Sequence, residues 1–306
     1  MRDFDVKLDI HYCGICHSDV HAGLNELGGC KYPIVPGHEM VGIVTEVGSK
    51  VTKVKVGDKA GIGCITDACL DCEACSNNDE NYCLKFGICG TYNSIKRPDG
   101  HYGGNLSTQT FGGYSGSHSV HEHFIIKVPE EIPLDKAGPL LCAGITMYDP
   151  LKHWGATAGG KNVGIIGIGG LGTMGIKLAK AMGNRVVAIS TSAAKEAMAK
   201  EKGADAFIIS KDPESMKTEA AKLDLILNTV SAPHECSEYL SLLAQGGVIV
   251  QLGIIGEPQH INQMPLVVQR KAIAGSVIGG IANTQECFEF CAKHKIFPDT
   301  QLVEAK

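Results

Sequence analysis

The stretch Asn162-Val163-Gly164-Ile165-Ile166-Gly167-Ile168-Gly169-Gly170-Leu171-Gly172 decides the fold of the second half of the chain. An apolar run ends in glycine, and apolar residues then recur at helical spacing through Met174, Leu178 and Met182. A bare G-x-G-x-x-G pattern is weak evidence, but between a strand and a helix its glycines permit a tight turn and a close backbone approach. The helix N-terminus then offers free N–H groups to a pyrophosphate, which favours a dinucleotide-binding turn over a purely structural one.

Outward from this stretch, short apolar runs alternate with helix candidates. The runs that follow it are residues 185–190, 206–210, 223–230, 248–252 and 272–278. Helix candidates lie between them, the clearest at 193–202, and a last one covers 284–294. Strands and helices that alternate through short links predict a parallel, doubly wound sheet.

The end of the second predicted strand bears on the choice of dinucleotide. An NAD site usually presents an acidic residue there, which holds the ribose 2′-hydroxyl. This chain instead has Ser190-Thr191-Ser192-Ala193-Ala194-Lys195, without a carboxylate. The hydroxyls and the lysine suit a 2′-phosphate, so the pattern favours NADP(H) over NAD. The same residues also suit a helix N-cap, and the two interpretations are compatible.

The chain before about residue 130 follows a different pattern, typical of short strands joined by glycine turns. Val- and Ile-rich stretches lie at 6–12, 40–47 and 51–60, broken by Gly48 and by Gly57-Asp58. This spacing predicts a small β-barrel or sandwich. Residues 84–118, rich in small and polar side chains, are expected to form an extended loop.

Composition excludes several classes of protein. The 306 residues predict two domains at about 150 residues each. A net charge of −5 without a basic stripe argues against nucleic-acid binding. No apolar stretch reaches the roughly 18 residues of a membrane span, and no secretory signal opens the sequence, so we expect a cytoplasmic protein without a membrane partner. The 13 cysteines therefore indicate reduced thiols and metal binding rather than disulfides.

The strongest metal signal is a short cysteine-rich segment. Cys69, Cys72 and Cys75 are spaced C-x-x-C-x-x-C, and Cys83 follows. Four thiolates complete a tetrahedral zinc shell and leave no open position, which is typical of a structural site. The alternative is a set of incidental thiols in a loop, which the tight spacing disfavours.

A second signal is spread along the chain. It combines the segment Cys13-Gly14-Ile15-Cys16-His17, the histidine of Pro36-Gly37-His38-Glu39, and the lone Cys142. One Cys, one His and one distant Cys leave the fourth zinc position open, as catalysis needs. Taken separately, the C-x-x-C pair could be redox-active and a lone buried cysteine is mostly a small apolar side chain.

Three further histidines, His118, His121 and His123, lie close together. We interpret them as a solvated strand face, with His121 and His123 on one side, rather than as another metal site.

The combination of motifs resembles the zinc-dependent medium-chain dehydrogenases/reductases, most closely the branch of cinnamyl alcohol dehydrogenases and NADP-dependent aldehyde reductases. The matching stretches are the glycine turn and residues 12–19, 35–39, 139–146 and 273–279. The resemblance implies an α/β protein. A GroES-like β-barrel catalytic domain would cover 1–135, a Rossmann NADP-binding domain with the doubly wound parallel sheet 136–280, and the start of a return segment 281–306.

Site residues are carried over from the same resemblance. It implies that Cys16, His38 and Cys142 hold the catalytic zinc. Glu39 would lie beside the metal and enter its shell when substrate is absent, and Asp19 would orient His38. Ser18 would take the alcohol proton and pass it through the cofactor ribose towards His21. Further residues would line the cofactor, namely His17 near the pyrophosphate and Thr146, Gly253, Ser276, Val277 and Ile278 on the nicotinamide side.

The implied activity is hydride transfer between NADP(H) and a primary alcohol or aldehyde, mainly as an aldehyde reductase. Zinc would bind the substrate oxygen and lower the alcohol pKa or polarise the carbonyl. An NAD-dependent polyol or formaldehyde-type dehydrogenase, an inactive zinc-binding remnant and a zinc-module nucleic-acid binder stay as alternatives. The resemblance also predicts a homodimer through the edge of the Rossmann sheet.

The resemblance carries an expectation about the ends of the chain. Family members begin with strands before the segment that matches Val6 and continue with a helix and a strand beyond the segment that matches Phe297. A chain truncated at both ends is therefore expected, with a barrel that lacks paired edges.

Overall fold

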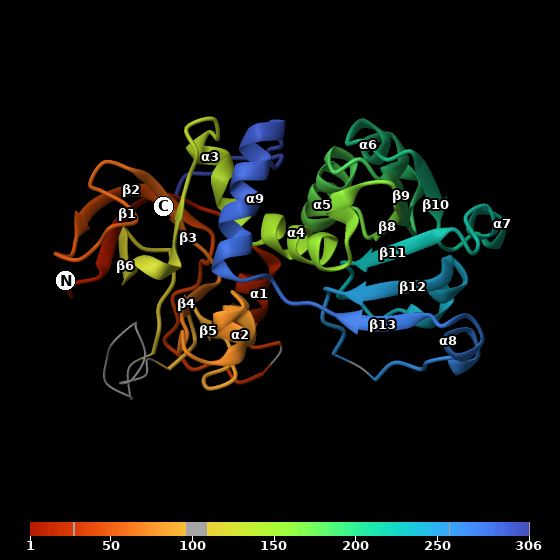
Figure 1. Ribbon diagram of the computed structural model, residues 1–306, viewed down its shortest axis with the longest axis horizontal. Coiled ribbons are helices and arrows are strands. Elements are labelled where there is room, and N and C mark those ends of the chain that lie inside the picture. Colours follow the sequence, from red (N-terminus) through yellow and green to blue (C-terminus); the bar gives the residue numbers. More distant parts are fainter. Residues whose placement is uncertain (27, 96–108, 257, 306) are drawn as a thin grey trace. The chain divides into compact units, whose positions relative to one another are not determined.

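The computed structural model describes residues 1–26, 28–95, 109–256 and 258–305, which form two compact units (Figure 1). The first unit is discontinuous and contains Met1–Ile145 and Ile278–Lys306. The second unit, Thr146–Val277, is a single stretch of chain. Of the extended loop predicted over 84–118, residues 96–108 lie outside the described residues.

The first unit is built on a five-stranded antiparallel sheet in the order β6-β1-β2-β3-β7. Alternate residues of β1, Val6 and Leu8, are fully buried, which is the period of a half-buried strand. A separate two-stranded sheet joins β4 to β5. The strands are β1 (Asp5–Cys13), β2 (Met40–Val47), β3 (Lys59–Ile62), β4 (Ile65–Asp67), β5 (Cys89–Gly90), β6 (Ser117–His121) and β7 (Ile125–Lys127).

Strand β3 begins only at Lys59, so only the end of the Val-rich stretch 51–60 is strand, and the predicted break at Gly57-Asp58 is confirmed as a turn. Gly57 has a φ of 93° and its N–H donates to the carbonyl of Val44. The N–H of Val44 in turn donates to the carbonyl of Asp58. These two bonds fold the segment into a tight turn against β2, and regular pairing starts only after it.

The first unit also contains short helices, and one longer helix, from the far end of the chain, packs on strand β7. The helices are α1 (His17–Leu24), α2 (Glu73–Ser76), α3 (Leu134–Ala137) and α9 (Ile281–His294), with 3-10 turns η1 (Glu80–Tyr82), η2 (Glu122–Phe124) and η3 (Gly138–Leu141). Helix α4 (Ala143–His153) contains the boundary between the units.

The second unit contains a six-stranded parallel sheet in the order β10-β9-β8-β11-β12-β13, which confirms the doubly wound sheet (Figure 1). Its strand order reverses between β8 and β11, where sheets of this kind bind ligands. The strands are β8 (Asn162–Ile166), β9 (Arg185–Ser190), β10 (Ala206–Ile209), β11 (Leu223–Asn228), β12 (Leu243–Gln251) and β13 (Ala272–Gly275). The helices are α5 (Gly170–Ala181), α6 (Glu196–Glu201), α7 (Pro213–Lys217) and α8 (Gln263–Gln269), with 3-10 turns η4 (Ala156–Ala158), η5 (Ala193–Lys195) and η6 (Cys236–Ser241).

The core of the second unit explains why its strands read as continuous apolar runs. Val187, Ile189, Ile208, Ile226 and Ile249 are fully buried in one cluster. Parallel strands covered on both faces bury every side chain, so alternation is lost. Among the described residues, no helix combines the length and the apolar character that a membrane crossing needs.

Candidate metal centres and cofactor site

The predicted structural zinc ligands converge in one loop of the first unit. The sulfur atoms of Cys69, Cys72, Cys75 and Cys83 all lie within 4.8 Å of one another. Helix α2 starts directly after Cys72 and brings Cys75 back towards it within one turn. The backbone N–H groups of Cys75 and Leu84 donate to the Cys72 thiol and lower its pKa to about 6, although burial opposes this. The thiolate, the form that binds metal, is thereby favoured.

The spacing of these sulfur atoms fits zinc. Zn–S bonds of about 2.3 Å in a tetrahedron place two sulfur atoms about 3.8 Å apart. The sulfur atoms of Cys69 and Cys75 lie 3.8 Å apart. With four thiols present and no further ligand needed, the loop matches a closed structural site.

The second cluster brings together ligand atoms from distant parts of the chain. One ligand atom each from Cys16, His38, Glu39 and Cys142 lies within 4.8 Å of the others. Cys16 is the N-cap of α1, His38 and Glu39 directly precede β2, and Cys142 lies between η3 and α4. The sulfur atoms of Cys16 and Cys142 are 3.9 Å apart, and His38 Nε2 is 3.3 Å from Cys142 Sγ. These distances also suit one tetrahedral zinc.

Asp19 fixes the orientation of His38. Its Oδ1 accepts from the backbone N–H of Gly37 and lies 3.2 Å from His38 Nδ1, while its Oδ2 accepts from the N–H of Cys16. Burial opposes ionisation, but the bonds from His38, Cys16 and Gly37 outweigh it and lower the pKa of Asp19 to about 2. The bond at Nδ1 leaves Nε2 free to face the metal position. The hydroxyl of Tyr114 donates a further bond to Oδ2.

Glu39 is the fourth member of the cluster and differs from the others in its proton affinity. Its side chain is buried, and its Oε1 lies 4.0 Å from His38 Nε2. Burial raises the pKa of Glu39 to about 7. A carboxyl group in this position can bind the metal, or it can leave the fourth coordination position to a substrate oxygen.

The predicted proton-transfer residues lie on helix α1. Ser18 and His21 are three residues apart on the helix, so their side chains face the same side. The Cys16 thiol donates to the Ser18 hydroxyl at 3.6 Å, which places Ser18 beside the metal ligands. His21 Nδ1 lies 2.5 Å from a carboxylate oxygen of Glu26, a partner that sequence reasoning missed. The ring of His17 packs edge-on against that of His21, with centroids 4.6 Å apart.

In the second unit, the glycine turn has the geometry that dinucleotide binding requires. Gly167 follows β8 with a φ of 87°, which favours glycine. A Cβ atom on Gly172 would lie 1.8 Å from the carbonyl oxygen of Gly167, so no side chain fits at this close approach. Gly169 is the N-cap of α5, which begins at Gly170 and includes Leu171. The first N–H groups of α5 are therefore available to a phosphate.

Most of the other predicted cofactor residues of this unit follow the carboxyl ends of its parallel strands. Ser190 ends β9, and Thr191, Ser192 and Lys195 follow it. Gly253 follows β12, while Ser276 and Val277 follow β13. Thr146 is buried on α4, and Ile278 opens the second segment of the first unit. Contacts of these residues and of His17 with a bound cofactor stay predictions.

Asn228 at the end of β11 is a second residue that sequence reasoning missed. It is fully buried, and its side-chain amide donates to Gln251 Oε1 at 2.7 Å. The backbone carbonyl of Asn228 accepts hydrogen bonds from the backbone N–H groups of Leu252 and Gly253. The signal available in the sequence was a polar residue at the end of an apolar strand. A buried amide is normally hydrogen-bonded, so a polar residue at this position indicates a side chain that holds the nearby backbone.

The three histidines interpreted as a strand face are arranged differently. His118 is buried in β6, and His123 lies in η2 rather than in the strand, so that interpretation is wrong. Turn η2 starts after His121, whose ring accepts from the N–H of His123. All 13 cysteines lie in the described part of the chain as free thiols.

Comparisons with known proteins agree with this geometry. Residues 2–130 match the alcohol dehydrogenase GroES-like domain, and residues 170–293 match the zinc-binding dehydrogenase family. An NADP-dependent alcohol dehydrogenase of Mycolicibacterium smegmatis is 48% identical over 98% of this chain and 83% of its own. The 8-hydroxygeraniol dehydrogenase of Catharanthus roseus is 50% identical over 98% of this chain and 81% of its own.

Solved structures extend the comparison. A cinnamyl alcohol dehydrogenase from Sorghum bicolor superposes with a TM-score of 0.93 at 41% identity, over 99% of this chain and 84% of that one. The Helicobacter pylori cinnamyl alcohol dehydrogenase complexed with NADP(H) gives a TM-score of 0.88 at 36% identity, with the same coverage. The expected GroES-like and Rossmann architecture is confirmed. The chain therefore belongs to the zinc-binding medium-chain alcohol dehydrogenases, in the branch of the cinnamyl and NADP-dependent alcohol dehydrogenases.

Proposed function

We propose that this chain is an NADP(H)- and zinc-dependent alcohol dehydrogenase that works mainly as an aldehyde reductase on aromatic or aliphatic aldehydes. The observation that carries the proposal is the convergence of Cys16, His38, Glu39 and Cys142 within 4.8 Å. Two thiols and an imidazole leave room for a substrate oxygen at the fourth position. Relatives at 48% and 50% identity are named an NADP-dependent alcohol dehydrogenase and an 8-hydroxygeraniol dehydrogenase.

The chain's own residues would control orientation and protons. Bound zinc would supply a Lewis acid and the nicotinamide a hydride carrier. Asp19 would keep His38 in the tautomer that presents Nε2 to the metal position. Ser18 would exchange a proton with the substrate oxygen. His21, with Glu26 at Nδ1, would exchange that proton with solvent.

Preference for NADP(H) is proposed from the residues that follow β9. No carboxylate occurs from Ser190 to Lys195, and the acidic residue that comes next, Glu196, pairs with Lys200 at 2.6 Å. The N–H of Ser192 donates to the Ser190 hydroxyl, which folds the hydroxyl-rich turn back on the strand end. This turn would hold the 2′-phosphate, with Lys195 supplying positive charge.

A homodimer through the sheet edge is also proposed. Strand β13 ends the described order of the parallel sheet, and α8 precedes it. Val267 and Val268 of α8 are 79% and 69% exposed, and Met264 is 67% exposed. Apolar side chains gathered at a sheet edge are typical of a subunit interface. We further propose a cytoplasmic location, since zinc sites of this kind need reduced thiols.

The test is oxidation of NADPH by the zinc-loaded chain with an aromatic aldehyde, with NADH in parallel. Turnover with NADPH well above that with NADH is expected. Protein shown to hold zinc at both clusters but inactive with either cofactor would refute the proposed activity. Equal turnover with NADH would refute the assignment of the β9 turn.

A further inference from the structure

The segment that joins the two units carries backbone strain. Ile278 has a φ of 42°, which a β-branched residue rarely adopts. The boundary between the units falls between Val277 and Ile278. Strained residues persist only where their surroundings hold them in place. We call residues 276–280 the junction. The groups that pack against the junction therefore determine its conformation.

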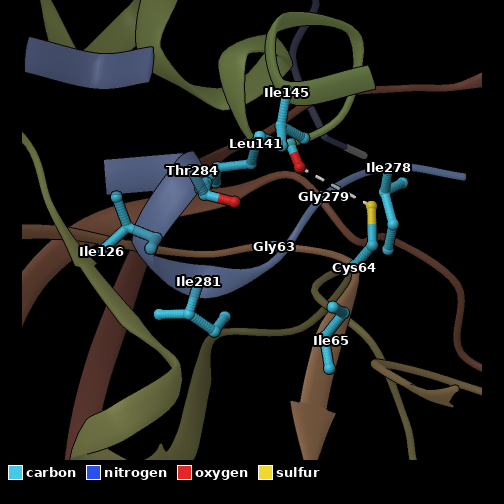
Figure 2. Close-up of a pocket in the computed structure, with 10 residues that line it drawn as sticks. All are labelled: Gly63, Cys64, Ile65, Ile126, Leu141, Ile145, Ile278, Gly279, Ile281 and Thr284. Atoms are coloured by element: carbon cyan, nitrogen blue, oxygen red, sulfur yellow. Dashed lines mark hydrogen bonds between the residues drawn. The ribbon is translucent and has the colours of Figure 1, made fainter. Parts of the chain in front are cut away.

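One neighbour of the junction is the segment that contains Leu141, the residue directly before the proposed zinc ligand Cys142. A cavity of about 10 Å³, enough for about one water molecule, separates the two (Figure 2). Figure 2 shows Cys64, Leu141 and Ile278 among the residues that line this cavity, with the Cys64 thiol donating to the Leu141 carbonyl. The walls of the cavity are Gly63, Cys64, Ile65, Ile126, Leu141 and Ile145, and from the other segment Ile278, Gly279, Ile281 and Thr284. The junction thus packs beside the residue that precedes a zinc ligand.

The other neighbour is the four-thiol loop, through Glu80. This residue lies between Cys75 and Cys83, and it is only 1% exposed. Its Oε2 accepts from the N–H of Ile281 at 3.0 Å, and its Oε1 lies 2.6 Å from His123 Nε2. A Cβ on Gly280 would lie 1.7 Å from the carbonyl oxygen of Asn78 and 2.6 Å from Glu80 Oε2. The loop therefore touches the junction so closely that only glycine fits.

The charge of Glu80 suits this position. Burial opposes its ionisation, but the bonds from His123 and from the N–H of Ile281 outweigh burial and lower its pKa below the usual range. A carboxylate at the first turn of α9 (Ile281–His294) also interacts favourably with the positive end of the helix dipole. Glu80 thus anchors the start of α9, directly after the junction.

We propose that Glu80 is a positioning residue that couples the four-thiol zinc loop to the junction 276–280 and thereby to the binding of NADP(H). The structural zinc orders the loop, the loop holds Ile281 and Gly280, and these hold Ile278 in its strained conformation. The proposal rests on the proposed function, because residues 276–278 line the cofactor only in an NADP(H)-dependent enzyme. It assigns the four-thiol loop a role in cofactor affinity as well as in stability.

The test compares Glu80→Ala, Glu80→Gln and Glu122→Ala with the unmodified chain, all loaded with zinc. Glu122 is the control, because its carboxylate likewise accepts bonds from backbone N–H groups distant in sequence, but those groups belong to Thr52 and Lys53 and not to the junction. Dissociation constants for NADPH are measured by calorimetry, with kcat and KM alongside. Hydrogen exchange is followed in peptides that cover 276–284.

Glu80→Ala is expected to raise the Kd and KM for NADPH about tenfold, with a smaller change in kcat and both zincs retained. Exchange in 276–284 should accelerate by a similar factor, while β8 and β9 stay unchanged. Glu80→Gln can still bridge Ile281 and His123 and should stay within about threefold of the unmodified Kd. Glu122→Ala should leave the Kd for NADPH unchanged.

Several results would overturn the proposal. One is a Kd for NADPH that does not change in Glu80→Ala, and another is hydrogen exchange that accelerates throughout the chain rather than in 276–284. The others are a Kd that rises equally in Glu122→Ala, or a Glu80→Gln variant that binds NADPH as weakly as Glu80→Ala. If Glu80→Ala does not fold, Glu80→Asp decides, since its shorter side chain cannot reach both partners. An unmodified chain that fails to bind NADPH would refute the proposed function instead, and the exchange data would still decide the coupling.

Discussion

The two metal clusters of the first unit are built in opposite ways. The four-thiol cluster takes all its ligands from one loop, and its partners Cys69 and Cys75 are six residues apart. The other cluster joins Cys16 to Cys142 across 126 residues and adds His38 and Glu39 from before β2. A contiguous site can close as its loop folds around a metal, whereas a dispersed site exists only after the sheet has assembled. The first cluster therefore supports the fold, and the second depends on it.

The sharpest test of this difference removes a dispersed ligand. Cys142→Ala is expected to lower turnover about a thousandfold or more and to lose about one zinc per chain, since three protein ligands are needed to hold a catalytic zinc. The melting temperature should change little. Cys287→Ala, which removes another buried thiol outside both clusters, is the control and should keep activity and zinc. Turnover at the control level in Cys142→Ala would contradict the metal assignment.

Removing a contiguous ligand should act on stability instead. Cys72→Ala is expected to lose about one zinc and to lower the melting temperature by about 10 °C or more, because structural zinc contributes directly to folding. Calorimetry and metal analysis measure both effects. Cys30→Ala, a thiol outside both clusters, should melt like the unmodified chain. A Cys72 variant with normal melting would remove the contrast between the two sites.

A substitution beside the dispersed site should have an intermediate effect. Asp19→Asn keeps the size of the side chain but loses the charge that holds His38 Nδ1. Loss of such a partner typically weakens zinc affinity 10- to 100-fold, so a competition assay with a chelator should strip this site first. Chelation of the four-thiol cluster should proceed as in the unmodified chain. Equal loss from both sites would show that Asp19 acts on the fold rather than on the metal.

The smallest expected effect concerns another contiguous pattern, the turn after β9. Ser190→Asp places a carboxylate where a 2′-phosphate would lie and should shift the ratio of kcat/KM for NADPH over NADH about tenfold towards NADH. Zinc content and melting should not change. Ser241→Asp, at an exposed position outside this turn, is the control. A ratio that stays constant in Ser190→Asp would mean that the phosphate is read elsewhere.

The distinction between contiguous and dispersed residues also explains which parts of the fold and the site could be predicted from the sequence. The four-thiol loop and the glycine turn were predictable because spacing along the chain places their atoms. The identity of Cys16 rather than Cys13 as a ligand needed the family resemblance, since both belong to one C-x-x-C pair. Glu80 was missed because its partners, Ile281 and His123, are set by tertiary contacts. Glu26 was missed because it lies beyond the end of α1, where the left-handed conformation of Asn25 brings the chain back towards His21. The break at Gly57-Asp58 was predictable from its residue types, whereas the absence of strand over residues 51–56 was not, because β-propensity depends on tertiary context.

The discontinuity of the first unit has a consequence for how the protein is made. Translation adds about 5–20 residues per second, and domains fold as units while the chain emerges. The bond between Glu80 and Ile281 spans 201 residues, so a nascent four-thiol loop waits roughly 10–40 seconds for its partner. The whole second unit is synthesised within that interval and can fold while the first is still open. Zinc that is captured early by the loop would therefore protect its thiols during the most exposed period of synthesis.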